Sequence, residues 1–346
     1  MRKVNLLSML LSVGIATSMI IVTSCTKEGP AGPAGQNGEN GINGKDGNAT
    51  CGVCHDNSEE VEARITQWGA SIHAIGGRFF ENGTSCAPCH TSQGFKEVVV
   101  TGAQTTAATI ENPNNINCYT CHKIHDTYTV DDWQLRYSAP ITFWFNGENH
   151  DFGKGNLCAH CHQSRPSSTF PDVTNPEGDY TVTSTRFGPH HGPQSEALVG
   201  SGVYMVGEGY FNSSHAEVPD ACVTCHKSVA VGNTSGGHTF NIYDEEEGTY
   251  NVSGCVACHT EDEAIANIEE FQPEILALLD QLGTLLATAG ILDPVADAAI
   301  KGTFTNNVAG AYWNYRFVRE DKSLGVHNPK FIQKLLENSI AVFPTN

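Results

Sequence analysis

Apolar residues gather near the two ends of the 346-residue chain, and the long stretch between them has only short apolar runs. The run of residues 4–21 follows a basic pair, Arg2 and Lys3, and ends shortly before Cys25. A basic start and a short apolar core are typical of an export signal, and the run is short for a membrane span. Residues 1–24 are therefore predicted to be a signal peptide.

In the first half of the chain the pattern predicts one helix and one strand. Apolar residues at helical spacing predict a helix over residues 59–75, which places His73 at its C-terminal end, just before two glycines. Loose alternation over residues 140–145 indicates a short strand. The acidic run of residues 244–247 indicates a solvated loop, with a calcium site as the alternative.

Three further helices are predicted at the C-terminal end. The first covers residues 271–290, with Pro273 near its start, where proline is tolerated. The second covers residues 308–319, and the third begins after Asn328, a residue type suited to the N-cap. The expected fold is mainly α with extensive irregular loops and a C-terminal helical segment.

The sparse middle stretch contains the sequence Cys-x-x-Cys-His six times. Two thiols separated by two residues can each form a thioether to one vinyl group of the same haem, and the histidine that follows then coordinates the iron. This spacing is the attachment signature of c-type haem, and it predicts six covalent haems c. The thiols are Cys51, Cys54, Cys86, Cys89, Cys118, Cys121, Cys158, Cys161, Cys222, Cys225, Cys255 and Cys258, and the histidines are His55, His90, His122, His162, His226 and His259.

Structural zinc, redox-active dithiols and disulfides also use such cysteine pairs. None of them requires a histidine directly after every second cysteine, so haem attachment is the favoured interpretation. A domain this poor in aliphatic residues has little to build a core from. The haems are therefore expected to form the core, giving a multihaem cytochrome c fold whose apoprotein is poorly folded.

The second axial ligand decides the chemistry of each iron: methionine gives a high potential, histidine a lower one, and an open position permits substrate chemistry. Met205 is the only methionine beyond the signal peptide, and a packing role is favoured for it. Nine histidines lie outside the six motifs, and His160, between the cysteines of its own motif, is badly placed for that haem. The expected iron ligands are His73, His125, His190, His215, His238 and His327, with His191 as the alternative to His190 and His150 in reserve.

His125 follows the motif histidine His122 by three residues. This is too close for it to reach the opposite face of the same iron. We therefore expect His125 to bind an adjacent haem, so that residues 118–125 join two haems.

The residues around Cys25 resemble a lipobox, the cleavage site of bacterial lipoproteins. Cys25 is the thirteenth cysteine and has no partner in the six motifs, although a stray thiol after an ordinary signal peptide is the alternative. Thr26 in place of aspartate favours the outer membrane of a Gram-negative bacterium, facing the periplasm or the cell surface. Glycine at every third position over residues 29–47 resembles a collagen-like tract, which is expected to serve as a tether, with trimerisation as the alternative.

These observations divide the chain into four parts. They are the signal peptide over residues 1–24, the anchor and tether over 25–48, the six-haem domain over 49–262 and the helical segment over 263–346. Removing the signal leaves 17 basic against 38 acidic residues, a balance of −21. Nucleic acid is therefore excluded as a partner, and a cationic redox partner, a metal ion or an oxide mineral is favoured.

Several segments resemble a group of exported bacterial multihaem cytochromes c, some of them related to nitrite-reductase-like proteins. They are Gly-Pro-His-His-Gly-Pro-Gln (188–194), Cys-Val-Thr-Cys-His (222–226), Gly-Gly-His-Thr-Phe (236–240), Trp-Asn-Tyr-Arg-Phe-Val (313–318) and Gly-Val-His-Asn-Pro (325–329). The resemblance covers residues 51–340 and implies mainly bis-histidine haems that pass electrons. The chain has no Cys-x-x-Cys-Lys motif, which departs from the commonest ammonia-forming nitrite reductases.

The expected function is electron transfer, without catalysis, between redox partner proteins of the envelope or to an extracellular acceptor. One alternative is reduction of a small nitrogen or sulfur oxyanion at an open haem, with Arg165, Arg186 or Tyr204 as donors. Another is a polymer of cytochromes in which a spare histidine completes a neighbour's haem.

Overall fold

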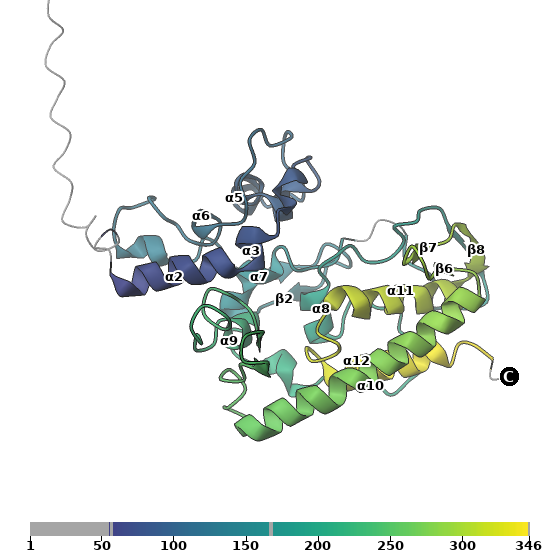
Figure 1. Ribbon diagram of the computed structural model, residues 1–346. Helices are drawn as coiled ribbons and strands as arrows, with labels where there is room; N and C mark the ends of the chain where they lie inside the picture. Colours follow the sequence, from purple (N-terminus) through teal and green to yellow (C-terminus); the bar gives the residue numbers. More distant parts are fainter. Residues whose placement is uncertain (1–54, 56–57, 166–168, 345–346) are drawn as a thin grey trace, which may run out of the picture. The chain divides into compact units, whose positions relative to one another are not determined.

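The computed structural model describes residues 55, 58–165 and 169–344, all of which belong to one compact unit. The predicted signal peptide, Cys25, the glycine-rich tract and the first two motif cysteines, Cys51 and Cys54, lie outside the described residues. The described part is mainly helical with irregular loops and a few short strands (Figure 1). The expected fold class is confirmed.

The α-helices are α2 (Glu59–Ala70), α3 (Ile72–Ile75), α4 (Ala87–His90), α5 (Ser92–Thr101), α6 (Cys118–Cys121), α7 (Asn156–Ala159), α8 (Gln194–Val199), α9 (Cys222–His226), α10 (Glu261–Thr288), α11 (Asn306–Asp321) and α12 (Pro329–Ile340). The 3-10 helices are η2 (Arg78–Phe80), η3 (Val130–Trp133), η4 (Gly153–Gly155) and η5 (Ser214–Glu217). Eight strands form four antiparallel pairs: β1 (Ile141–Thr142) with β2 (Asn149–His150), β3 (Asp179–Val182) with β8 (Gly302–Thr305), β4 (Tyr243–Asp244) with β5 (Thr249–Tyr250), and β6 (Leu292–Asp293) with β7 (Ala298–Ala299).

The helix predicted over residues 59–75 is two helices, because the backbone of Ser71 is extended between α2 and α3. The Ser71 hydroxyl and its N–H both donate to the carbonyl of Trp68, which closes the last turn of α2. His73 lies in the short helix α3. The strand predicted over residues 140–145 is only the two-residue β1, since the chain turns back at Phe143 to pair with β2.

The prediction for α10 was wrong at its N-terminal end. The helix begins at Glu261, directly after Thr260, and Pro273 lies in its interior rather than near its start. Thr260 and Glu263 form a capping box, in which the Glu263 carboxylate accepts from the Thr260 N–H at 2.9 Å. The capping box starts the helix directly after the sixth motif, and the helix continues through Pro273 although that residue lacks an N–H to donate.

The other two C-terminal helices lie where they were predicted. α11 extends two residues beyond the predicted range at each end, with the Thr305 hydroxyl capping its first turn. α12 begins at Pro329 with Asn328 in the N-cap position, but the Asn328 side chain makes no cap hydrogen bond and instead accepts from the Ser213 N–H at 2.9 Å. None of the helices in the described ranges is long and apolar enough to cross a membrane.

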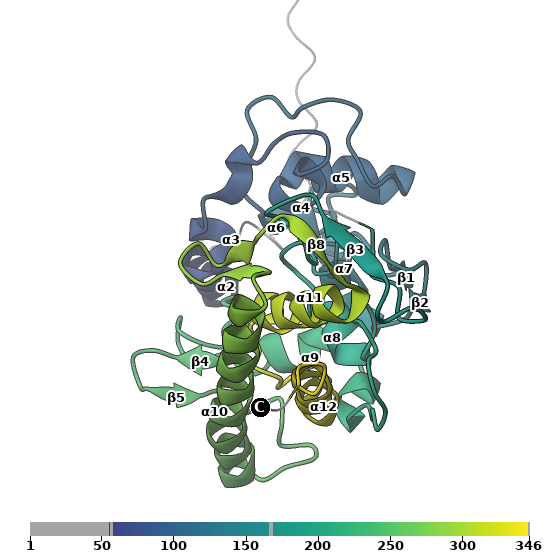
Figure 2. The ribbon, with the colours of Figure 1, turned by 90° about the vertical axis from the view of Figure 1, so that its right-hand side faces the viewer.

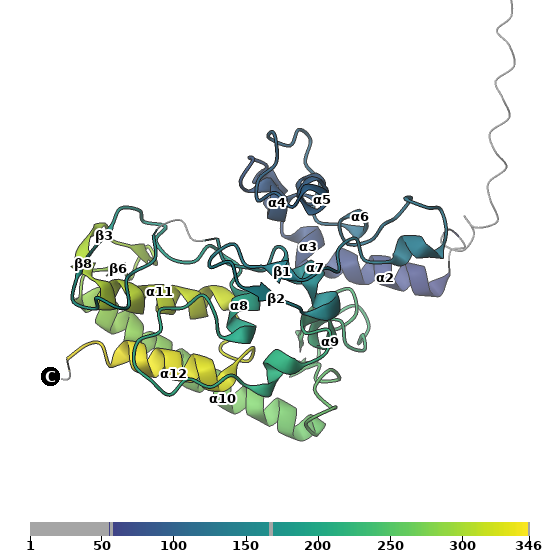
Figure 3. The same ribbon diagram turned by 180° about the vertical axis from the view of Figure 1, so that it is seen from behind.

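A conventional apolar core lies where α10, α11 and α12 pack together, and Figure 2 shows these helices from the side. Of the sixteen residues of α11, twelve are buried, including Trp313 and Phe317. Residues from between the fourth and fifth motifs complete the core, among them Val182, Phe187 and Val203. The β3–β8 pair covers one end of α11, as seen from behind in Figure 3. The C-terminal helices therefore share one apolar core with the stretch between the fourth and fifth motifs.

The acidic run is not wholly solvated. Asp244, the last residue of β4, is buried and accepts hydrogen bonds from the Thr234 hydroxyl and from the N–H groups of Glu246 and Glu247. It shapes the turn between β4 and β5. No cluster of metal-binding side chains is found in the described part of the chain, so nothing here supports the calcium alternative.

Candidate functional site

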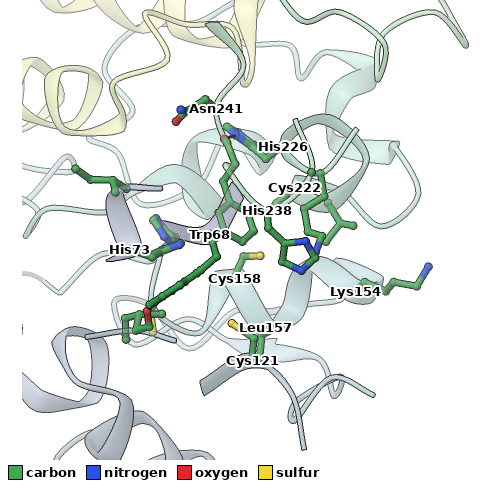
Figure 4. Close-up of a pocket in the computed structure, with 18 of the residues that line it drawn as sticks. Trp68, His73, Cys121, Lys154, Leu157, Cys158, Cys222, His226, His238 and Asn241 are labelled. Atoms are coloured by element: carbon green, nitrogen blue, oxygen red, sulfur yellow. Dashed lines mark hydrogen bonds between the residues drawn. The ribbon is translucent and has the colours of Figure 1, made fainter. Parts of the chain in front are cut away.

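A single large cavity of about 2520 Å³ brings the described cysteine-histidine motifs together. Ordinary small-molecule pockets have roughly 300–1,000 Å³, so this one has room for several large groups. Figure 4 labels His73, His226 and His238, together with Cys158 and Cys222, among the residues that line this cavity. The lining includes all six motif histidines and seven of the other nine, namely His73, His125, His190, His191, His215, His238 and His327.

Each described motif winds its cysteines into a single helical turn. The N–H of His122 donates to the carbonyl of Cys118 at 2.8 Å, and the same bond closes the motifs of His90, His162 and His259. Residues three apart on such a turn lie on the same side. The local fold therefore presents both thiols and the following imidazole to the same space.

Five pairs of histidine rings face one another across the cavity. Every pair joins one motif histidine to one histidine from outside the motifs, and the partners are dozens of residues apart in the sequence. The separations of ring centroids are 6.1 Å for His55 and His125, 6.2 Å for His162 and His73, 6.3 Å for His122 and His238, 6.2 Å for His226 and His327, and 6.5 Å for His259 and His215.

These separations match the geometry of two imidazoles bound to opposite faces of one iron. A metal–imidazole bond is about 2.0 Å long and the bonding nitrogen lies roughly 1.1 Å from the ring centroid, so the two centroids should be about 6.2 Å apart. The interplanar angles differ between pairs, as rotation about the iron–nitrogen axis allows. The donor set and its spacing therefore fit bis-histidine haem.

Hydrogen bonds fix the tautomer of several of these rings. Nδ1 of His122 lies 2.6 Å from the Trp133 carbonyl, that of His226 2.9 Å from the Phe240 carbonyl, and that of His215 2.8 Å from the Val326 carbonyl. A carbonyl only accepts, so Nδ1 must carry the proton. Nε2 then keeps the lone pair that a metal requires.

Two more rings are oriented by side chains. His162 lies 3.1 Å from the Gln194 amide oxygen, and His327 lies 2.6 Å from the buried carboxylate of Asp321. Asp321 also raises the pKa of His327 against the effect of burial, which lowers it. A carboxylate behind a ligating histidine makes its imidazole a stronger donor to the metal.

The remaining motif histidine, His90, lies near the pair His190 and His191. Burial, together with the charges of His191 and His90, lowers the pKa of His190 to about 4, so this ring is neutral at ordinary pH. His191 is held differently, with Nδ1 2.5 Å from a carboxylate oxygen of Glu320. Both rings line the cavity, and their centroids are 5.0 Å apart.

His150 and His160 are not among the described residues that line the cavity. The ring of His150 stacks on Phe143, with centroids 4.6 Å apart. His160 is buried, with its ring 5.1 Å from that of Phe95 and 5.2 Å from that of Tyr137. Met205 is 43% exposed, which does not fit the packing role favoured for it.

The donors proposed for an anion-reducing site are not gathered in one place. Arg165 lines the cavity and stacks on Trp144, with the guanidinium carbon 5.2 Å from the ring centroid. Tyr204 is buried in the apolar core, where its hydroxyl donates to Asn307 at 3.1 Å. Arg186 is exposed and, like Tyr204, is not among the described lining residues.

Three residues that line the cavity were not predicted from the sequence. Asp132 is buried and holds the loop of His125. The Phe240 ring lies 5.1 Å from that of His73 and 6.1 Å from that of His238. Lys227 is largely buried, with its amine 3.0 Å from Nε2 of His238, and burial lowers its pKa. The position of Lys227 directly after the fifth motif was the only feature of the sequence that could have indicated its role.

Comparison with solved structures finds a likeness to a cytochrome. No protein-family model matches the chain, and no curated protein matches it either. The crystal structure of the outer cell wall cytochrome OcwA matches with a TM-score of 0.51 and 22% sequence identity, over 81% of this chain and 50% of that one. The chain thus spans about half the length of the solved structure that it matches, and it shares the fold of that part of a cytochrome.

Proposed function

We propose that this chain is a c-type cytochrome that transfers electrons through six covalently bound haems, each with two histidine ligands. The observation that carries the proposal is the set of five ring pairs, each of one motif and one other histidine, at separations of 6.1 to 6.5 Å. The fold shared with part of a cytochrome supports it.

In this proposal the chain's own residues attach, ligate and enclose the haems. The pairs are His55 with His125, His90 with His190, His122 with His238, His162 with His73, His226 with His327, and His259 with His215. The haems supply reversible one-electron chemistry at iron, and histidine on both faces favours a low potential. No iron keeps an open position, which favours electron transfer over reduction of a bound substrate.

We also propose the cell envelope as the place of action. Lipidation of Cys25 would anchor the chain to the outer membrane, and residues 26–48 would act as the tether. Its redox partners would be envelope proteins or an extracellular acceptor that tolerates a strongly acidic surface.

Intact-mass measurement of the purified holoprotein, followed by EPR of its fully oxidised form, tests the proposal. We expect the mass of six haems on the chain and low-spin ferric signals alone. A mass increase of fewer than six haems would contradict the haem count. A high-spin ferric signal, together with turnover of nitrite or hydroxylamine, would instead establish the reductase alternative.

A further inference from the structure

The fourth motif, residues 158–162, contacts the second motif through its second cysteine. The thiol of Cys161 lies 3.8 Å from the carbonyl of Pro88. The side chains of Cys89 and Cys161 lie next to each other. Arg165, three residues beyond the fourth motif, donates to the carbonyl of Ser85, next to the second motif.

The first cysteine of the fourth motif points to a different neighbour. The side chains of Cys158 and Cys222 lie next to each other, so the fourth motif also adjoins the fifth. Lys154 and Asp220 form an ion pair at 2.7 Å just before these two motifs. Ala159 packs in the same apolar cluster as Cys222.

The third motif adjoins the fourth as well. Cys121 of the third motif lies near both cysteines of the fourth, Cys158 and Cys161. Phe240 links the ligand sets of three motifs. Its ring lies against His73 and His238, the proposed ligands of the fourth and third haems, and its carbonyl accepts from His226 of the fifth motif.

The first and sixth motifs each have one such neighbour among the described residues. His55 of the first motif faces His125, which the third motif carries on its C-terminal side. Directly before the sixth motif, a Cβ at Gly254 would lie 3.0 Å from the Cα of Cys225. The sixth motif therefore packs on the fifth.

We infer that the six attachment motifs form a branched array, in the order first, third, fourth, fifth and sixth, with the second joined to the fourth. This inference rests on the proposed six-haem function. A thioether sulfur lies on the rim of its haem, so cysteines in contact bring the edges of two haems together. The order of the motifs would set which of the attached haems lie close enough to exchange an electron directly.

Two matched variants test the branch point. His73 and His215 lie in the same sequence context, Ser-x-His-Ala, and serve the fourth and sixth haems. Methionine raises the potential of a haem, so in H73M or H215M the altered haem is reduced and diamagnetic at a potential where its neighbours stay ferric. EPR signals broadened by magnetic coupling to that haem should then sharpen. Each EPR signal is first assigned to its haem by replacing the six proposed non-motif histidine ligands one at a time.

We expect H73M to sharpen the signals of three haems, the second, third and fifth, and H215M to sharpen that of the fifth alone. Equal numbers of sharpened signals in the two variants would overturn the branched order. A wild-type protein with fewer than six haems, or with a high-spin iron, would contradict the proposed function itself. Six low-spin haems with the wrong neighbours would contradict only the order.

Single-thioether variants provide a second test that leaves all six histidine pairs in place. In C161A the signal of the second haem should shift together with that of the fourth, since the contact with Cys89 is lost. In C158A the fifth haem should shift with the fourth instead. If both variants disturb the same neighbour, the assignment of the two edges is wrong.

Discussion

At the residue scale, Asp132 holds the backbone of His125, a proposed haem ligand, without contacting its ring. Its two oxygens accept from the N–H groups of His125 at 2.8 Å, Thr127 at 2.7 Å and Tyr128 at 3.1 Å. His125 has a φ of 64° and Tyr128 a φ of 60°, a conformation that is unfavourable for residues with a side chain. Asp132 compensates for this strain and aims the imidazole at His55.

We expect D132A to release the loop, so that in a fraction of the molecules the first haem lacks its second ligand. The third haem should remain attached and low-spin, because the ring of His122 is held by the Trp133 carbonyl and not by this carboxylate. EPR should show a high-spin ferric signal, and H125A should give the same signal at higher intensity. Asp131 is the matched control, since it is exposed and, among the described residues, its carboxylate accepts a hydrogen bond only from the Gln134 amide, so D131A should leave the spectrum unchanged. A D132A spectrum in which the third haem alone changes would refute this role.

At the element scale, α8 and α11 meet around a buried carboxyl group. One oxygen of Glu196, in α8, accepts from the N–H of Ser164 at 2.7 Å, and the other has no hydrogen-bond partner among the described residues. Burial, and to a lesser extent the charge of Asp321 at the end of α11, raises the pKa of Glu196 from 4.5 to about 7. The folded protein therefore binds this proton more tightly than the unfolded chain does.

The sign of the pH dependence follows from this difference. Between pH 4.5 and about 7 the folded state holds more protons than the unfolded state, so the stability that comes from Glu196 is lost as the pH rises through that range. The loss is on the order of 3 kcal/mol. Because glutamine stays neutral, E196Q should lose less stability than the wild type over this pH range. The free energy of unfolding of both proteins is measured from pH 4 to 8 by denaturant unfolding followed by circular dichroism. If the two proteins lose stability in parallel as the pH rises, Glu196 is not responsible.

At the scale of the whole molecule, the proposed anchor should be separable from the haem-binding part. Without the thiol of Cys25 no lipid can be attached, so C25S should move the protein from the membrane fraction to the soluble fraction with its haem content unchanged. S24A keeps a small residue before the cysteine and should leave the protein in the membrane fraction. A C25S protein that still sediments with membranes would exclude lipidation of Cys25 as the anchor.

The boundaries of elements were predictable where a local signal was strong. Asn328 and Pro329 marked the start of α12 correctly, whereas the start of α10 was missed because its capping residue, Thr260, lies outside the apolar repeat. The core that Val182 and Phe187 share with α11 was not predicted. Val182 ends the four-residue strand β3 and Phe187 lies in irregular chain, so neither residue belongs to an apolar repeat long enough to show that it is buried.

For the site, the sequence by itself determined which cysteines and histidines can attach haem, because the chemistry is contained in five consecutive residues. It also narrowed the second ligands to a few histidines, whose ligation stays a prediction. Only the tertiary structure decided that His125 faces His55, that His73 faces His162, and that the fourth motif touches both the second and the fifth. These contacts join segments far apart in the chain, and long-range packing leaves no local pattern in the residues that it brings together.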